Sequence, residues 1–511
     1  MVENEGVPME AVAGERAGLS NGFSEGDGGD GVDGDGGNGV DAPRHAGGAA
    51  PLRPWSTWAA VRTGPGGWSP GAVRLLAFGL VAFQVVQGSY AARANANDPF
   101  VESYYLITYR HGFVRHGLLG EVLRLVGAPT TDSTGKFASF VVAGVMVVAL
   151  VVAIELLIRQ RSTASAAMAV LLAASPFCID FALVDRRPDL MAIALLVVLG
   201  LVVTRVRSHQ VAWLAAVGVG FGAMVLVHED VALIELPWAV VLVAVATLGR
   251  TGRMFGGPGD GRADPADCRA AVRLTARLVA LGAAPFLAAL AVLLSGVPSP
   301  GQVTRLRADV VGFSYKGQTE FDYLRQTLSQ SFHLVGSMPR FVQRDTMAVG
   351  LVLVALQVIW VVRWVTPGVW EPFTQAGNRA VGAFVAVIVS GATVLLFATG
   401  FDWLRWFCDC GASWLVVQAF AVLVLVPSPR DAGAGRRAVR QRLRSGERAT
   451  RSELAILSSG AGDGGSGRGD PRGQRIPLPA WLPAAAVYLA AMPPLAAVAT
   501  GGPFHPFFFF V

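Results

Sequence analysis

The chain has 511 residues, of which 53% are apolar and only 15% charged, and its formal net charge is +6. Soluble domains carry about 25% charged residues, so this composition excludes an ordinary soluble protein. From residue 72 onward, apolar runs recur that approach the roughly 20 residues a helix needs to cross a bilayer. No series of short alternating segments indicates a barrel. The sequence therefore predicts an all-α fold, a polytopic transmembrane helical bundle.

Residues 1–50 differ from the rest of the chain. They hold ten acidic residues and two arginines, many glycines and few large apolar side chains. A segment with low hydrophobicity and high net charge cannot bury enough apolar surface to fold. We expect a disordered, acidic, glycine-rich tail on the cytoplasmic side.

Eleven apolar segments then predict eleven spans, ten of them in a transmembrane core over 72–427 and the last in 476–511 with its aromatic C-terminus. A long outer loop, 296–346, separates the seventh span from the eighth. A basic segment rich in Gly, Ser and Arg, 428–475, predicts a flexible cytoplasmic linker. The predicted spans are 72–90, 137–158, 164–184, 188–204, 211–228, 231–248, 274–295, 347–365, 379–400, 407–427 and 476–500.

Arginines beside the spans predict the orientation in the membrane. Arg159 and Arg161 follow the second span, Arg205 and Arg207 follow the fourth, and the linker 428–475 holds many more. Cytoplasmic loops carry such an excess of basic residues. We therefore expect a multi-pass plasma-membrane protein with a cytoplasmic N-terminus and an external C-terminus. Membrane lipids are then partners, through apolar helices and through arginines near head groups, and no nucleic-acid partner is expected.

This orientation places five polar clusters on the outer side. Ionisable groups at span ends cost several kcal/mol if they face lipid, so we expect these clusters to face a shared cavity. The clusters are NDPFVE (97–102) leading into RHGFVRHG (110–117), Asp180 with DRRPD (185–189), HED (228–230), the loop 296–346, and FDWLRW (401–406).

Some of these residues also fit purely structural roles. Asp98 before Pro99 fits a helix N-cap with proline at the first helical position. Asp402 and Arg405, three residues apart, fit an intrahelical ion pair. His228 and Glu229 are one metal-binding or proton-relay possibility, but a zinc-type site needs a third ligand, which the sequence does not indicate.

The stretch RHGFVRHG contains two Arg-His-Gly triplets, five residues apart. In one unbroken helix this step would turn the two pairs about 140° away from each other. Gly112 and Gly117 predict that the helix is interrupted, because glycine permits turns. One interpretation is an amphipathic segment at the membrane surface. The other is a bend at Gly112 that brings Arg110 and Arg115 to one phosphate beside Asp98.

The layout of residues 70–430 resembles GT-C-type glycosyltransferases, polytopic enzymes that take a sugar from a polyprenyl-phosphate carrier on the outer face of the membrane. In that class an essential acidic residue follows span one, and a short interfacial helix lies in the same loop. A second acidic cluster often lies between spans three and four. Here Asp98 and Glu102 stand in the first place and residues 100–126 in that of the helix. The second place is taken by Asp180, Asp185 and Asp189.

The resemblance implies inverting transfer of a hexosyl or pentosyl group for cell-envelope polysaccharide or glycoconjugate synthesis. A carboxylate would take the proton of the acceptor hydroxyl. The leaving lipid phosphate would be stabilised by arginines or by a divalent cation. The implied catalytic residues are Asp98, Glu102 and Asp185. The implied ligands of the lipid phosphate are Arg110, Arg115, Arg186, Arg187 and Arg405. The supporting polar residues are Asp180, Asp189, His111, His116, His228, Glu229 and Asp402.

Other classes of function remain open. A Wzy-like polymerase or ligase also works on the outer face, with arginine and histidine and without an acidic first loop. A transporter or flippase is the non-enzymatic alternative, and it should carry charges near the bilayer midplane. A structural subunit of an envelope assembly would use the outer clusters only as an interface. The chain contains no GxxxxGK[ST] or HExxH motif of a soluble enzyme.

Overall fold

The computed structural model describes residues 68–94, 98–251, 265–313, 319–337, 340–364, 373, 378–399, 402–426 and 482–490. These residues form helices and no named strand. Among them, eight helices are long and apolar enough to cross a membrane, and Leu190–Arg205 and Met347–Val361 are shorter apolar helical stretches. The predicted all-α polytopic bundle is confirmed.

Eleven helices correspond to the predicted core spans, the third span being divided into two. They are α1 (Pro70–Ala94), α4 (Asp132–Gln160), α5 (Thr163–Ala174), α6 (Ile179–Asp185), α7 (Leu190–Arg205), α8 (Gln210–Val227), α9 (Glu235–Thr251), α10 (Pro265–Ser295), α14 (Arg340–Trp364), α16 (Arg379–Thr399) and α17 (Trp403–Leu425). Of the predicted last span, the structure describes α20 (Leu482–Ala490). The predicted tail 1–50 and linker 428–475 lie outside the described residues.

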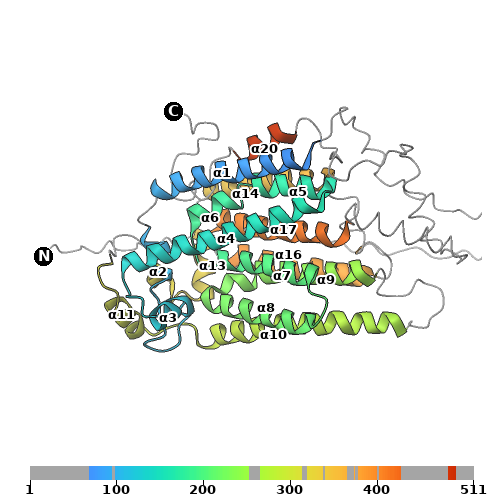
Figure 1. Ribbon diagram of the computed structural model, residues 1–511. Coiled ribbons are helices and arrows are strands. Elements are labelled where there is room, and N and C mark those ends of the chain that lie inside the picture. Colours follow the sequence, from blue (N-terminus) through green and yellow to red (C-terminus); the bar gives the residue numbers. More distant parts are fainter. Residues whose placement is uncertain are drawn as a thin grey trace, which may run out of the picture. The chain divides into compact units, whose positions relative to one another are not determined.

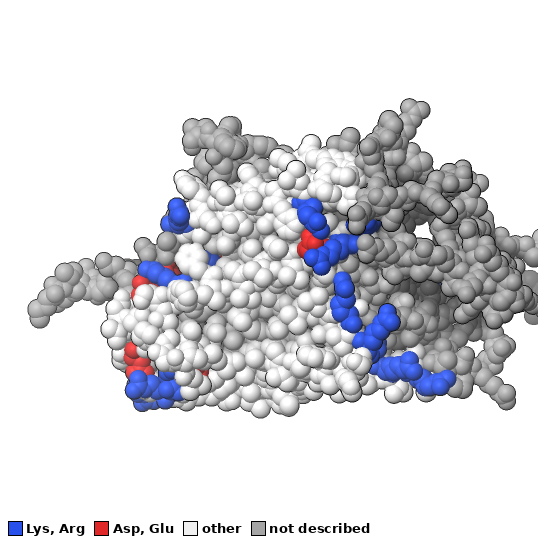
Figure 2. Space-filling model, viewed as in Figure 1, with Lys and Arg blue, Asp and Glu red and all other residues white. Residues whose placement is uncertain are grey.

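On the face shown in Figure 2, charged side chains lie toward the ends of the helices, as expected for helices that cross a membrane. Figure 2 shows a broad band without Lys, Arg, Asp or Glu on this face of the described part, with charged residues toward the two ends of the helices. On the end where α4 finishes, Arg159 and Arg74 pair with Glu155. The apolar band matches the lipid-facing surface of a membrane protein.

The third predicted span is interrupted rather than continuous. Helix α5 begins at a capping box formed by Ser162 and Ser165 and ends at Ala174, and α6 begins at Ile179. Residue 176 between them is a proline, which has no backbone N–H to continue the helix. Gln84 of α1 compensates, because its amide donates to the Ala174 carbonyl at 3.0 Å. Irregular backbone at membrane depth is tolerated where protein buries it in this way.

Helices α5 and α6 lie at the centre of the bundle and α16 lies at its edge. Over the candidate span Thr163–Asp185, 94% of the apolar window is buried inside the protein, against 11% over Arg379–Ala398. Helix α4 packs against α5 and α7, and α17 packs against α7 and α9 (Figure 1). The buried centre therefore joins α17, late in the chain, to helices of its first half.

Two glycines bring α8 and α10 into close contact. A Cβ atom at Gly218 would lie 2.5 Å from the backbone carbonyl oxygen of Leu281, and one at Gly222 would lie 3.0 Å from the carbonyl carbon of Ala284. Small residues four apart allow this close approach of backbones between membrane helices. Helix α10 runs beside α8 along one edge of the bundle in Figure 1.

Short helices cover the end of the bundle where α4 begins. They are α2 (Pro99–Tyr104), α3 (Leu118–Leu125), the 3-10 helix η2 (Glu229–Ala232), α11 (Pro300–Ala308), α12 (Glu320–Tyr323) and α13 (Leu328–Ser337). Figure 1 places α2, α3 and α11 together there. Leu106, Ile107 and Val114 pack with Val303 and Leu306 of α11 in a small apolar core. We call this end of the bundle the polar end.

The polar end differs from the sequence prediction in two respects. The predicted helix over 100–126 is two short helices, α2 and α3, joined by an irregular segment that contains Gly112 at φ 110°. That conformation favours glycine, so the predicted interruption is confirmed. The predicted loop 296–346 contains α11, α12 and α13, and it is shorter than predicted because α14 begins at Arg340.

Candidate functional site

Arg405, at the beginning of α17, joins three chain segments at the polar end. Its guanidinium donates to Asp402 at 2.8 Å, to Asp230 at 3.2 Å, to Asp409 at 3.4 Å and, more closely, to Asp189. The Arg405 side chain is only 5% exposed. These contacts tie the turn before α7 and the helix η2 to α17. The predicted ion pair between Asp402 and Arg405 is confirmed, and Arg405 also holds carboxylates distant in sequence.

Arg187 extends this network toward α2. It donates to Asp402 at 2.7 Å, lies 3.5 Å from Asp185, and its guanidinium lies 4.8 Å from the ring centre of Phe100. Although burial alone would raise the pKa of Asp402, Arg187 and Arg405 hold it well below its usual range. The Arg187 side chain is 14% exposed, so it lies nearer to solvent than Arg405.

A second group centres on His116, in the segment just before α3. His116 Nδ1 lies 2.6 Å from Glu320 of α12, and Nε2 contacts Glu229 of η2 more closely still. Arg115 donates to Glu229 at 3.1 Å and to the backbone carbonyl of Tyr323. His116 has φ 62°, a left-handed conformation that is uncommon for a non-glycine residue. The fold holds that backbone in place through these contacts.

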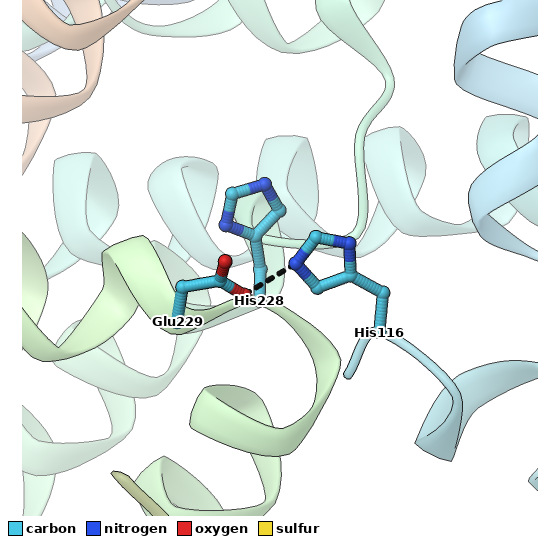
Figure 3. Close-up of side chains that lie close together, drawn as sticks. All are labelled: His116, His228 and Glu229. Carbon is cyan, nitrogen blue, oxygen red and sulfur yellow. Dashed lines mark hydrogen bonds and ion pairs between the residues drawn. The ribbon is translucent and has the colours of Figure 1, made fainter. Parts of the chain in front are cut away.

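His228 stacks against His116. The ring centres are 4.8 Å apart and the ring planes 13° from parallel. The Tyr104 hydroxyl lies 3.3 Å from His228 Nε2, and the backbone N–H of Asp230 donates to Nδ1 at 3.3 Å. Figure 3 shows His116, His228 and Glu229 turned toward one another from two different chain segments.

The two imidazoles have opposite pKa shifts. Burial alone would lower the pKa of His116, but the carboxylates of Glu229 and Glu320 outweigh it and raise this pKa to about 9. Burial lowers the pKa of His228, which has only partial compensation from Asp230. At neutral pH the pair therefore consists of one cationic and one neutral ring.

Among the described residues, His116, His228 and Glu229 are the one group of three histidine, cysteine or acidic side chains close enough together to share a metal ion. One possible ligand atom from each lies within 4.8 Å of the others. Sequence analysis lacked a third ligand for the His228–Glu229 pair, and the fold supplies His116, 113 residues away from Glu229. No local spacing relates His116 to this pair, so the sequence held no signal that His116 joins it.

Asp98 and Glu102, the predicted acidic residues of the first loop, have different environments. Asp98 caps α2, because its carboxylate accepts from the backbone N–H of Phe100 at 3.0 Å. The side chain of Glu102 is 3% exposed and lies 3.9 Å from the Lys136 ammonium. Burial and a hydrogen bond with Asp132 raise the pKa of Glu102 to about 8, so it retains its proton at neutral pH.

Several predicted site residues lie apart from these networks. His111 lies 2.9 Å and Arg110 3.5 Å from Asp309, so the two Arg-His pairs have different carboxylate partners. Arg110 and Arg115 therefore do not share a carboxylate, and their convergence on one phosphate stays a prediction. The Arg186 guanidinium lies 4.8 Å from the ring centre of Phe140. Its backbone is left-handed at φ 51°, at the end of α6.

Asp180 lies inside α6 and is 1% exposed. Among the described residues, neither oxygen of its carboxylate has a hydrogen-bond partner. Its backbone N–H donates to Gln84 at 3.4 Å, so Asp180 belongs to the interruption between α5 and α6. Asn97 and Phe401, which flank two predicted clusters, lie outside the described residues.

Sequence analysis gave no role to four acidic residues that complete the networks, although Asp230 belongs to the predicted HED cluster. Asp309 and Glu320 come from the loop 296–346, in which no residue was singled out. Asp230 lies beside the predicted His228–Glu229 pair, and Asp409 lies within α17. An acidic residue inside an apolar span is itself a signal of function, and it would have identified Asp409.

Comparison with known proteins supports the membrane assignment. A family model described as "Uncharacterised membrane protein Rv1490" matches residues 74–255, which include Asp98, His116, Arg187, His228 and Glu229. Uncharacterized protein Rv1490 of Mycobacterium tuberculosis and uncharacterized protein Mb1527 of Mycobacterium bovis are each 26% identical to the chain over 153 residues. The match covers 29% of this chain and 35% of each relative. No solved structure matches. The chain is thus a polytopic helical membrane protein that is similar to this family over residues 74–255.

Proposed function

We propose that the protein is a membrane glycosyltransferase that takes a sugar from a polyprenyl-phosphate carrier at the polar end and transfers it to a cell-envelope polysaccharide or glycoconjugate. One observation carries this proposal. Carboxylates and arginines from loops that are far apart in the sequence interlock at one end of an apolar bundle. A polyprenyl-phosphate sugar has an apolar tail and an anionic head. It therefore needs an apolar surface for the tail and arginines for the phosphate. The predicted orientation makes this end the outer face.

Arg187 and Arg115 are the best-placed ligands for the carrier phosphate. Both side chains are 14% exposed, and each already pairs with a carboxylate that is open to solvent on one side, Asp402 and Glu229. A guanidinium binds phosphate oxygens through a planar fork, so either arginine can stabilise the leaving phosphate as its charge develops. Arg405 serves a different role, since its carboxylate partners fix it in place and make it a positioning residue.

Asp98 is the better candidate for the general base. Glu102 keeps its proton at neutral pH because its pKa is about 8, whereas a base must be ionised before it can accept the acceptor's proton. Asp98 lies at the N-terminus of α2, where its carboxylate accepts hydrogen bonds from the backbone N–H groups of Phe100 and Val101. The Asp98 carboxylate would then take the hydroxyl proton as the acceptor oxygen attacks the anomeric carbon and the carrier phosphate leaves.

Turnover of a polyprenyl-phosphate sugar tests the proposal. The full chain in lipid nanodiscs is incubated with radiolabelled hexosyl and pentosyl polyprenyl phosphates and a total envelope extract as acceptor. Asp98→Ala should lower turnover by about 100-fold, within the range expected for loss of a general base. Glu155→Gln is the control, because Glu155 pairs with Arg74 and Arg159 at the opposite end of α4. Full turnover in both Asp98→Ala and Glu102→Ala would refute this mechanism.

The second candidate is a Wzy-like polymerase or ligase. The observation that favours it is the group of His116, Glu229 and Arg115, because that class relies on arginine and histidine. A histidine held between two carboxylates can shuttle a proton. His116→Ala would then abolish polymerisation of a lipid-linked oligosaccharide, while Asp98→Ala would leave it intact. The opposite result favours the glycosyltransferase.

A further inference from the structure

Two histidines and one glutamate at the polar end form a ligand set of mixed chemistry. His116 precedes α3, His228 ends α8 and Glu229 begins η2, and their possible ligand atoms lie within 4.8 Å of one another. Two imidazole nitrogens and one carboxylate oxygen are a donor set that catalytic zinc sites use, with a further position left open. Because the side chains come from separate chain segments, folding brings the set together.

The Nδ1 atoms of the two histidines have different neighbours. His116 Nδ1 lies 2.6 Å from Glu320, and His228 Nδ1 lies 3.6 Å from Asp230. A histidine that binds a metal through Nε2 commonly donates its Nδ1–H to such a carboxylate, which orients the ring and raises its basicity. His228 differs, because its Nδ1 accepts the backbone N–H of Asp230, and the Asp230 carboxylate at 3.6 Å lies beyond hydrogen-bond reach. The Glu320 carboxylate can therefore support His116 as a metal ligand.

A hydrogen-bonded proton lies between two of the candidate ligands. His116 Nε2 and Glu229 are in direct hydrogen-bond contact, so one hydrogen bridges two of the three candidate ligands. Metal binding would release that proton, as binding to histidine generally does. In tetrahedral coordination the ligand atoms are about 3.3 Å apart, so the widest separation must close by about 1.5 Å. Glu229, which is 34% exposed, can rotate toward the ion. The stacked rings of His116 and His228 must also rotate, because a metal lies in the plane of each imidazole that binds it.

We infer that His116, His228 and Glu229 form a binding site for a divalent transition metal of the Zn²⁺ class. Imidazole nitrogen favours Zn²⁺ and its neighbours over Mg²⁺ and Ca²⁺, which prefer all-oxygen ligands. Three protein ligands leave the fourth position free. The exposure of Glu229 places that position on the solvent side of the group.

The role of this metal in the reaction deepens the proposed function and rests on it. A metal at this place lies next to Arg115, which also contacts Glu229. Its open position would bind an oxygen of the carrier phosphate, and the metal and Arg115 would together neutralise the leaving group. Metal binding itself does not depend on which reaction the protein catalyses.

Metal content tests the site independently of activity. The full chain is purified in detergent without chelators, dialysed against micromolar Zn²⁺ and then against buffer, and analysed by mass spectrometry of its metals. The expected result is about one equivalent of Zn²⁺ per chain. His116→Ala should lower this content at least tenfold. His111→Ala is a closely matched control, because His111 stands in the other Arg-His-Gly triplet and lies 2.9 Å from Asp309.

Cobalt distinguishes loss of the site from loss of folding. Co²⁺ added to the wild-type chain should give the visible absorption of a tetrahedral ion, and this spectrum should weaken in Glu229→Gln while gel filtration of that variant is unchanged. Equal zinc in the wild type and in His116→Ala would overturn the inference, as would a chain that binds only Mg²⁺. Bound zinc without sugar transfer would retain the site and refute the proposed function. Full transfer by metal-free protein would refute the assigned role of the metal.

Discussion

Replacing Arg405 with alanine should destabilise the protein more than any substitution of a surface arginine. Arg405 is the cation that Asp189 and Asp409 share, and their side chains are only 4% and 2% exposed. Asp402 and Asp230 also lose a partner, but they are 26% and 18% exposed and water partly replaces it. The cost therefore arises mainly from two carboxylates that remain buried without their cation.

Removing one partner of a buried ion pair costs about 3–5 kcal/mol, and we expect Arg405→Ala to lie in this range. Arg405→Lys should fall between wild type and alanine, because an ammonium keeps the charge but not the planar fork that reaches several carboxylates. In Arg405→Ala combined with Asp409→Asn, part of the loss should be recovered, since one of the buried charges is then absent.

Unfolding in mixed detergent and SDS micelles measures these differences through the tryptophan fluorescence of the full chain. Arg159→Ala is the control, because its side chain is 68% exposed and pairs with Glu155 at the opposite end of α4. An exposed pair of this kind contributes under about 1 kcal/mol. If Arg405→Ala lost no more stability than Arg159→Ala, the Arg405 network would not hold the polar end together.

Three further predictions address other parts of the structure. The pKa of Glu102 is raised to about 8, so between its ordinary value of 4.5 and 8 the folded state binds more protons and its stability falls as pH rises. Glu102→Gln should therefore melt like wild type near about pH 5 and at a higher temperature than wild type near about pH 9, and equal melting at both would contradict this. Asp98→Asn should keep the cap of α2 and the stability of the protein, yet it should lose sugar transfer. If this variant transferred sugar at the wild-type rate, Asp98 would act only as a helix cap. Gly218→Ala should cost about 1–3 kcal/mol in the same unfolding assay, because its Cβ meets the α10 backbone. The matched Gly220→Ala meets only the movable side chain of Leu195 and should cost less, and equal losses would argue against close packing of α8 on α10.

The class of fold was predictable because a bilayer constrains the sequence directly. A helix that crosses lipid must be apolar over about 20 residues, so each span is visible as a local run. Local hydrogen bonding was equally visible. Asp98 before Pro99 predicted the N-cap of α2, and the spacing of Asp402 and Arg405 predicted their ion pair. Each of these features depends on residues within one or two turns of helix.

Hydropathy alone did not show where a span is interrupted. The stretch 164–184 is apolar throughout, yet α5 ends at Ala174 and α6 begins at Ile179. Pro176 signals such an interruption. The interruption leaves the Ala174 carbonyl without a partner inside its own helix. Gln84 of α1 donates a hydrogen bond to this carbonyl, which helps the bundle to tolerate the interruption.

The sequence by itself determined that this is a helical membrane protein with charged clusters at the ends of its spans. The tertiary structure alone decided which clusters meet. His111 and His116 stand in identical triplets, but one lies beside Asp309 and the other between Glu229 and Glu320. Because these partners are more than a hundred residues away, no local pattern distinguishes the two histidines. The packing of α8, α11 and α12 against the first loop distinguishes the two histidines. It places His116 beside His228 and Glu229, with which we propose that it binds a metal.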